Sequence, residues 1–168
     1  MTDKDNTMGK AELEKILKSH REWLLCISGG ERAELRNYDL TGADLTWADL
    51  RYADLKNIDL RNSDLRNIDL RNSYLINSDL RNVNLKNSDL RNVDLRNSDL
   101  RGANLDFASW PLWCGSLKVK VDSRIAKQLM YHALAVLPGE DREEFLADPR
   151  KYANGFHRVI SWDVEKIT

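Results

Sequence analysis

The residues best suited to metal binding or nucleophilic catalysis are three histidines and two cysteines. They are His20, His132, His157, Cys26 and Cys114. No two of them have the C-x-x-C or H-x-x-x-H spacing that brings ligands to one metal ion, and the cysteines lack the spacing of a disulfide framework. We therefore expect small, buried, reduced thiols, histidines that are satisfied or exposed, no metal and no cofactor. The sequence leaves open whether Cys114, His132 and His157 have any role.

Carboxylates are the other candidate catalytic groups, and their regularity argues against catalysis. Eleven aspartates directly precede a leucine, and in nine of these units Arg or Lys directly follows it. Paired catalytic carboxylates need a cleft that separates their pKa values. Aspartates beside bases at a fixed interval instead predict surface ion pairs, each worth about 0–1 kcal/mol. The sequence also lacks a P-loop, a G-x-S-x-G elbow, a Rossmann glycine fingerprint and an H-E-x-x-H helix. We predict that the protein is not an enzyme.

A five-residue period organises the middle of the chain. Leucine occupies every fifth position from Leu35 to Leu105, and Trp110 takes the next place. On an α-helix five residues overshoot one turn by about 140°, and a straight strand sends successive leucines to opposite faces. If the backbone turns a corner after each unit, every leucine points to a common axis. The small or β-branched residue two places earlier shares that direction, and the Asn or Gly two places after the leucine occupies the corner.

The units Ala43-Asp44-Leu45 and Ala53-Asp54-Leu55 match A-[DN]-L-x-x, the pattern of the pentapeptide-repeat family, which residues 31–110 resemble. The resemblance implies an all-β solenoid, a right-handed quadrilateral β-helix of about four coils at the ~4.8 Å inter-strand spacing. Stacked residues would then be twenty apart, with Asn ladders at the corners. The expected core leucines are Leu55, Leu60, Leu65, Leu70, Leu75, Leu80, Leu85, Leu90, Leu95 and Leu100.

Three residues depart from the repeat pattern. Tyr38 takes a small inward position, and Tyr74 and Ile76 flank Leu75. We expect them to mark a local bulge or an apolar surface patch.

The repeat divides the chain into three expected segments: a tail and capping helix over 1–30, the β-helix over 31–110, and a small, mostly α C-terminal domain over 111–168. An apolar face predicts the first helix from Lys10 to Ile27, with His20 and Trp23 at its edges and Gly29-Gly30 as its stop. Open solenoid ends need cover. We expect this cover from Leu17, Leu24, Trp110 and Trp113.

Beyond the repeat we expect a strand at residues 117–121. A helix would run from Asp122 or Ser123 to about Leu137, and shorter helices would follow near Asp141–Ala147 and Pro149–Ala153. Residues 156–164 fit strand or helix equally. Both flanks resemble those of pentapeptide proteins of bacteria and their phages, through motifs such as Trp113-Cys114-Gly115.

Charge and hydropathy limit the classes of partner. The net charge is −1, and acids and bases balance at five and five in residues 1–30, fourteen and twelve in 31–110, and eight and nine in 111–168. Because each basic column would adjoin an acidic one, the field is weak and direct nucleic-acid binding is not expected. The longest apolar run, Trp23 to Ile27, is too short to cross a membrane, and residues 1–10 lack the apolar core of a signal peptide. We expect a cytoplasmic protein.

These features favour a non-enzymatic repeat scaffold or protein-interaction module with an unknown protein partner, as a monomer or as a homodimer through the C-terminal region. The alternative is a DNA mimic that binds a type II topoisomerase, gyrase, as the fluoroquinolone-resistance branch of the family does. Such mimicry needs an acidic face, but bases occupy it: Arg61, Arg66, Arg71, Arg81, Arg91 and Arg96. The uniform units from Leu55 to Leu100 are also typical of an engineered or idealised array.

Overall fold

The computed structural model describes residues 6–110, 119–127 and 139–147. The chain divides into two compact units, Met1–Ile125 and Ala126–Thr168. The helices are α1 (Lys10–Leu24) and α3 (Gly139–Ala147), and residues 123–127 are also helical. The expected segment boundaries after residues 30 and 110 stay predictions.

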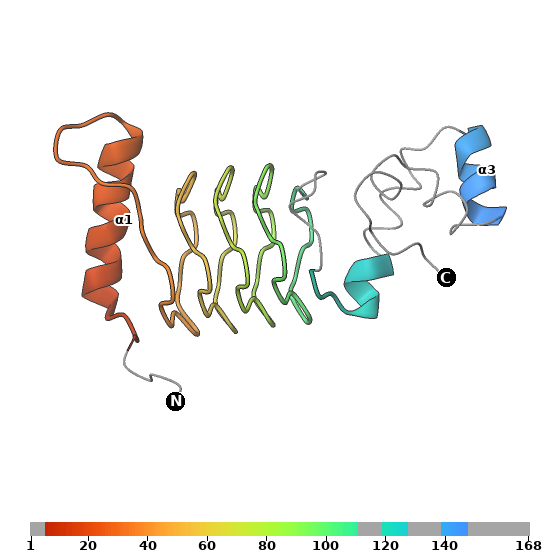
Figure 1. Ribbon diagram of the computed structural model, residues 1–168, viewed down its shortest axis with the longest axis horizontal. Coiled ribbons are helices and arrows are strands. Elements are labelled where there is room, and N and C mark those ends of the chain that lie inside the picture. The colour runs from red at the N-terminus through yellow and green to blue at the C-terminus, as the bar shows by residue number, and fades with distance from the viewer. Residues whose placement is uncertain (1–5, 111–118, 128–138, 148–168) are drawn as a thin grey trace. The chain divides into compact units, whose positions relative to one another are not determined.

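Between α1 and residue 110 the backbone winds into a coil with four five-residue units per turn (Figure 1). Parallel bridges join residues twenty apart, from Glu34 with Asp54 to Asp89 with Ser109. The predicted twenty-residue register is therefore confirmed. Each pairing is a single-residue bridge at the position before the leucine and not an extended strand, because the corner takes up part of every unit.

All fifteen corner residues of the array have a left-handed backbone. φ lies between 57° and 63° at the thirteen residues other than glycine, and is 72° at Gly42 and 77° at Gly102. The residue after the corner donates its N–H to the leucine carbonyl, as Ala43 does to Leu40 at 3.0 Å, which closes a type II turn. Asn tolerates this conformation better than most residues, and ten of the fifteen corners hold Asn.

The leucines line the coil axis. The ten from Leu55 to Leu100 are each at most 1% exposed. Among the residues two places earlier, four serines satisfy their hydroxyls inside the core, as Ser88 does by donating to the Leu65 carbonyl at 2.7 Å. The buried Ser73 hydroxyl has no hydrogen-bond partner. The core is therefore layered, with leucine at one inward position and small or β-branched residues at the other.

No bulge interrupts the coil at Tyr74. This residue forms parallel bridges with Asp54 and Asp94, so the register continues through it. Its ring is 40% exposed, and Ile76 is half-buried. Of the two expected meanings of these departures, an apolar surface fits and a bulge does not.

The first helix ends earlier than predicted. α1 stops at Leu24, because Cys26 takes a left-handed φ of 56° and closes a Schellman motif: its N–H donates to the Trp23 carbonyl, and the Ile27 N–H donates to Glu22. The prediction that Gly29-Gly30 stops the helix is wrong. Cys26 is exposed, so the prediction of a buried thiol is also wrong for this residue.

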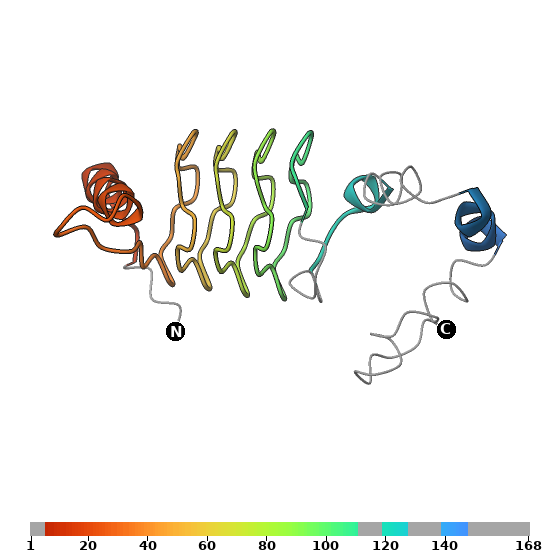
Figure 2. The same ribbon diagram turned by 90° about the horizontal axis from the view of Figure 1, so that it is seen from above.

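Seen from above, α1 lies at the N-terminal end of the coils (Figure 2). Leu13 and His20 are its buried residues, while Leu17 and Leu24 are half-buried. His20 was predicted at the edge of the helix face but is 0% exposed.

The residues before α1 pair with the first coil. Thr7 forms a parallel bridge with Asp39, and Asp39 donates its N–H to the Asn6 carbonyl at 3.0 Å. Part of the first coil's free backbone edge is covered in this way.

At the other end, Lys120 extends the coil by one parallel bridge with Asp99. Asp122 caps the helical segment 123–127 by accepting the Ile125 N–H at 3.0 Å, and it also accepts the Gly102 N–H at 2.7 Å. Trp110 is half-buried. α3 begins two residues before the predicted start, and the expectations for Trp113, residues 128–137 and residues 149–164 lie outside the described residues.

The corner conformation predicts a difference between two substitutions at Asn72. Asn72→Ala places a β-carbon in the left-handed region and removes the amide that accepts a bond from Asn92 at 3.4 Å. Asn72→Gly removes the same amide without the steric penalty. We expect the alanine variant to be less stable than the glycine variant by about 1 kcal/mol, measured by urea denaturation. Equal stabilities would contradict the role given to the corner.

Candidate functional site

The residue before each leucine has a backbone task. In the unit ending at Asn72, four N–H groups donate to main-chain carbonyls, and the fifth, that of Arg71, donates to Asp69 Oδ1 at 3.1 Å. The same side-chain bond recurs along the array, as from Arg61 to Asp59 at 3.1 Å, and Asn84 supplies it for Lys86 at 3.3 Å. Since an unpaired backbone N–H is costly, these Asp and Asn side chains are part of the fold.

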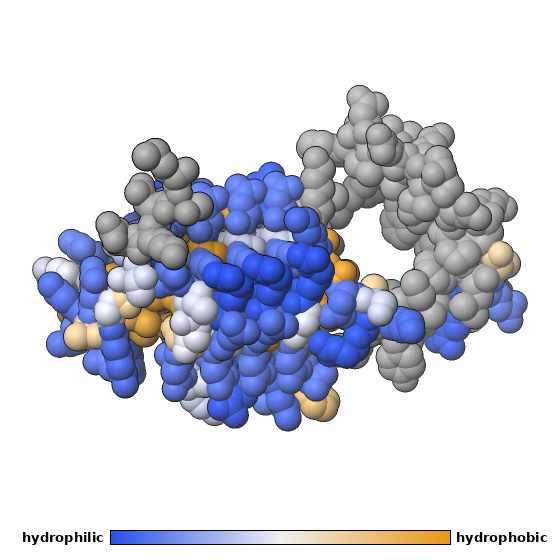
Figure 3. Space-filling view, turned by 90° about the horizontal axis from the view of Figure 1, so that it is seen from below, coloured by the Kyte–Doolittle hydropathy of each residue, from blue (hydrophilic) through white to orange (hydrophobic). Residues whose placement is uncertain are grey.

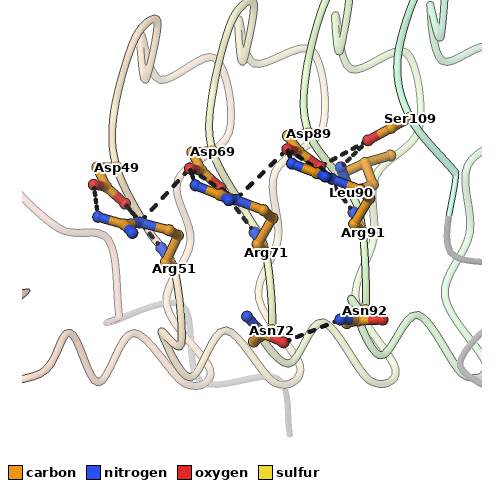
Figure 4. A network of polar contacts seen from close by, with 10 residues as sticks. All are labelled: Asp49, Arg51, Asp69, Arg71, Asn72, Asp89, Leu90, Arg91, Asn92 and Ser109. Atoms are coloured by element: carbon orange, nitrogen blue, oxygen red, sulfur yellow. Dashed lines mark hydrogen bonds and ion pairs between the residues drawn. The ribbon is translucent and has the colours of Figure 1, made fainter.

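The same carboxylates form a lattice of ion pairs on one side of the coil, shown in Figure 4. Within units, Arg51, Arg71 and Arg91 lie 2.6 to 2.7 Å from the aspartate two places earlier. Between coils, the Nε of Arg51 and Arg71 lies 3.6 and 3.5 Å from the next aspartate along the axis. We call this surface the Asp–Arg face; its residues are Asp49, Arg51, Asp69, Arg71, Asp89 and Arg91.

The lattice holds Asp89 and Arg71 in their charged forms. Arg91 and then Ser109 donate to the Asp89 carboxylate, and these bonds hold the pKa of Asp89 well below its usual range. The bond from Arg71 to Asp69 raises the pKa of that guanidinium. A carboxylate held ionised between donors is a poor general acid at neutral pH. The arrangement serves structure and recognition better than proton transfer.

A second side of the coil is hollowed into an open groove of about 420 Å³. Its walls repeat Arg and Asn at each coil, and the residues that line it are Arg61, Asn62, Arg81, Asn82, Arg101 and Gly102. Each of these arginines is already held by the aspartate of its own unit, at 2.5 to 2.6 Å. The groove therefore offers paired guanidinium groups and amides, and its lining contains no nucleophile.

The predicted His and Cys candidates do not come together among the described residues. His20 accepts the Ala33 N–H at its Nδ1 atom at 3.0 Å and stacks on Trp23 with a ring-centroid distance of 5.6 Å. Its Nε2 atom is buried without a hydrogen-bond partner, and burial lowers its pKa. Within the described ranges no three His, Cys, Asp or Glu residues cluster as metal ligands. Cys114, His132 and His157 lie outside these ranges.

Two aspartates differ from the outward position that the sequence predicted. Asp54 and Asp94 are 1% and 3% exposed. Asp54 lies 2.5 Å from Arg36 and 3.5 Å from Lys56, whose ammonium is 4.9 Å from the centre of the Tyr74 ring. The available signal was Tyr74, which takes the place of an aspartate between Asp54 and Asp94 in the same column.

The repeat unit, the twenty-residue register and the corner geometry agree with one family model. The model for pentapeptide repeats, which describes eight copies of the unit, matches this chain twice, over residues 31–67 and 68–106. The repeat region of this chain, residues 31–106, belongs to the pentapeptide-repeat family. Pentapeptide-repeat proteins fold as right-handed quadrilateral β-helices and are in general structural or interaction proteins without catalysis. A comparison with curated proteins gives no match.

Several solved structures resemble this pentapeptide-repeat protein over part of its length. HetL from the cyanobacterium Nostoc sp. strain PCC 7120, involved in the regulation of heterocyst differentiation, is 29% identical over 56% of this chain, with a TM-score of 0.46. A pentapeptide-repeat protein of the Arabidopsis thaliana thylakoid lumen is 17% identical over 65% of this chain and 79% of its own, at 0.40. QnrB1, a plasmid-mediated fluoroquinolone-resistance protein, is 19% identical over 61% of this chain and 69% of its own, at 0.32. The chain spans 40% of the length of HetL.

Because the aspartates accept hydrogen bonds from backbone N–H groups, we expect their capacity to accept a hydrogen bond to matter more for stability than their charge. Asp69→Asn keeps an oxygen for the Arg71 N–H, whereas Asp69→Ala leaves that N–H without a partner. We expect the alanine variant to be less stable than the asparagine variant by about 1 kcal/mol in urea denaturation. A larger loss in Asp69→Asn than in Asp69→Ala would show that the ion pairs dominate instead.

The buried imidazole of His20 predicts acid sensitivity. Because its pKa is lowered in the folded state, its contribution to stability is present above the unfolded-state pKa near 6.5 and is lost as the pH falls below that value. We expect the free energy of unfolding to fall by up to about 1.4 kcal/mol per pH unit in this window. His20→Gln, which does not titrate, is the control. Parallel pH profiles for both proteins would contradict the assignment.

Proposed function

We propose that this protein is a non-enzymatic scaffold of about four coils that presents repeated surfaces to a protein partner in the cytoplasm. The observation that carries the proposal is that the outward aspartates are already engaged in hydrogen bonds and ion pairs. In unit after unit the carboxylate accepts its own unit's N–H and pairs with arginine, as Asp69 does with Arg71. Groups held in this way are positioned for recognition of a surface and are not free for chemistry.

The surface composition supports the same proposal. Hydrophilic side chains cover most of the coils on the side shown in Figure 3, and hydrophobic ones are visible at the far end of the coils and at the α1 end. Several large apolar residues are exposed there and at the corners, including Trp47 at 77% and Leu25 at 62%. Aromatic residues and arginine are the types enriched in protein interfaces, and lysine is depleted. None of the described helices is long and apolar enough to span a membrane.

The alternative, a DNA mimic that binds gyrase, receives less support. A mimic of the DNA backbone must present uncompensated negative charge. Here Arg61 lies 2.6 Å from Asp59, Arg81 lies 2.5 Å from Asp79, and the pattern continues along the axis. QnrB1 is a fluoroquinolone-resistance protein, but its low TM-score of 0.32 lends the alternative no weight.

A supercoiling assay with purified gyrase distinguishes the two functions. We expect no inhibition and no protection from fluoroquinolone across a titration of the protein. The matched variant replaces Arg61, Arg81 and Arg101 with serine, which leaves their aspartates uncompensated. We expect this variant to be inactive as well. Inhibition by the unaltered protein, rising in the variant, would overturn the scaffold proposal in favour of the mimic.

A further inference from the structure

Three corners of the array hold large aromatic residues where the other twelve hold Asn or Gly. Trp47, Tyr52 and Phe107 have φ angles of 62°, 63° and 58°, a region that is unfavourable for bulky side chains. Their side chains are also 77%, 46% and 84% exposed. Backbone strain and exposed apolar surface both cost free energy in the monomer. Their coincidence at the same three residues indicates contacts outside the monomer.

All three aromatic corners border the Asp–Arg face. Trp47 is the corner before Asp49, and Tyr52 is the corner after Arg51. Phe107 stands sixty residues, or three coil steps, after Trp47 and so belongs to the same corner column. Outside the array, the Trp23 ring meets the Tyr52 ring edge-on at 6.4 Å between centroids. The face is therefore a neutral ion-pair lattice with exposed aromatic rings along its margins.

We propose that the Asp–Arg face is an interface between two copies of this chain, related by a two-fold axis parallel to the coil axis. The inference rests on the proposed interaction function and names its partner. The face carries an aspartate column on one side and an arginine column on the other, three charges in each. Rotation about this axis sets each aspartate column against the arginine column of the second copy. A two-fold axis perpendicular to the coil axis would set like charges together, so electrostatic complementarity selects the parallel axis.

The same rotation matches the two margins of the face. Trp47 of one copy then lies against Tyr52 of the second copy, and this contact occurs twice because the interface is isologous. In the next coils the corner residues Asn67 and Asn87 face Asn72 and Asn92, and their amides can both donate and accept hydrogen bonds. Aromatic pairs of this kind stabilise an interface beyond what their buried area alone contributes. Trp47 and Tyr52 thus occupy corners where a second copy would cover them.

The size of the face sets the expected affinity. One side of about four coils, with its aromatic corners, would bury on the order of 1,000 Å² in total, at the low end of specific interfaces. The dimer is therefore expected to be reversible, with a Kd on the order of micromolar or weaker. Opposed charge columns at the surface also imply that added salt weakens it.

Sedimentation equilibrium of the full chain over a wide concentration range tests the proposal. The double variant Trp47→Asn with Tyr52→Asn restores the prevailing corner residue and relieves backbone strain, but it also removes the contact between the Tyr52 and Trp23 rings. Urea denaturation therefore checks that it is folded before its Kd is compared. We expect the wild type to self-associate and the double variant to raise its Kd at least tenfold. Tyr74→Asp is the matched control, because it removes an exposed aromatic from a different face, and it should leave the Kd within about twofold.

Disulfide trapping tests the symmetry in a background with Cys26→Ser and Cys114→Ser. Chains with Asn67→Cys mixed with chains with Asn72→Cys should form the mixed disulfide, because the parallel axis faces these corners with each other. The perpendicular axis faces each corner column with itself and predicts no mixed bond. A monomer at all concentrations, or a dimer that the double variant leaves unchanged, would overturn the proposal. Either result would leave the scaffold function standing, which only the gyrase assay can remove.

Discussion

A left-handed residue at every fifth position is the constraint on which the array depends. Each corner turns the chain so that the next leucine again points to the axis, and it fixes which N–H groups remain for the neighbouring coil. Four N–H groups of a unit then find main-chain carbonyls and one does not, as the unit from Ile68 to Asn72 shows. The aspartate before the leucine fills that gap. Leucine thus fills the core, aspartate accepts the one N–H that has no main-chain partner, and asparagine adopts the left-handed conformation of the corner.

Much of this architecture could be predicted from the sequence, because the same residue pattern recurs in unit after unit. The period alone excludes a helix and a straight strand. The resemblance to the pentapeptide-repeat family adds four units per coil, from which the twenty-residue register and the Asn ladders follow; Asn97, for example, donates to Asn77 at 3.2 Å. The end of α1 did not follow, since Cys26 closes the helix in a conformation that favours Gly or Asn. One copy of a local signal is weaker than fifteen copies of a repeated one.

The candidate surface was predicted only in part. Alternating acids and bases predicted paired columns, but not that Asp54 and Asp94 are buried or that the carboxylates serve the backbone first. An aspartate before the leucine suits both an ion pair and a hydrogen bond to a backbone N–H. The residue type alone therefore does not show which of the two interactions it makes. The residues that depart from the repeat distinguish these roles. Asn84 accepts the backbone N–H without carrying a charge, and Trp47 and Phe107 adopt the left-handed corner conformation without a side-chain amide. Departures from a strict repeat therefore deserve more weight in functional interpretation than its regular units.

The fixed count of four units per coil also governs how such a chain can change in length. Gain or loss of twenty residues shifts one end along the axis by a whole step and leaves both ends facing the same directions. Gain or loss of five residues rotates one end by a quarter turn relative to the other. Thr7 bridges Asp39 at one end and Lys120 bridges Asp99 at the other, so each terminal segment is bound to one side of the square. Duplication of single units would therefore redirect these segments, whereas duplication of whole coils would preserve their orientation. The number of five-residue units thus sets the angle between the two terminal segments about the coil axis.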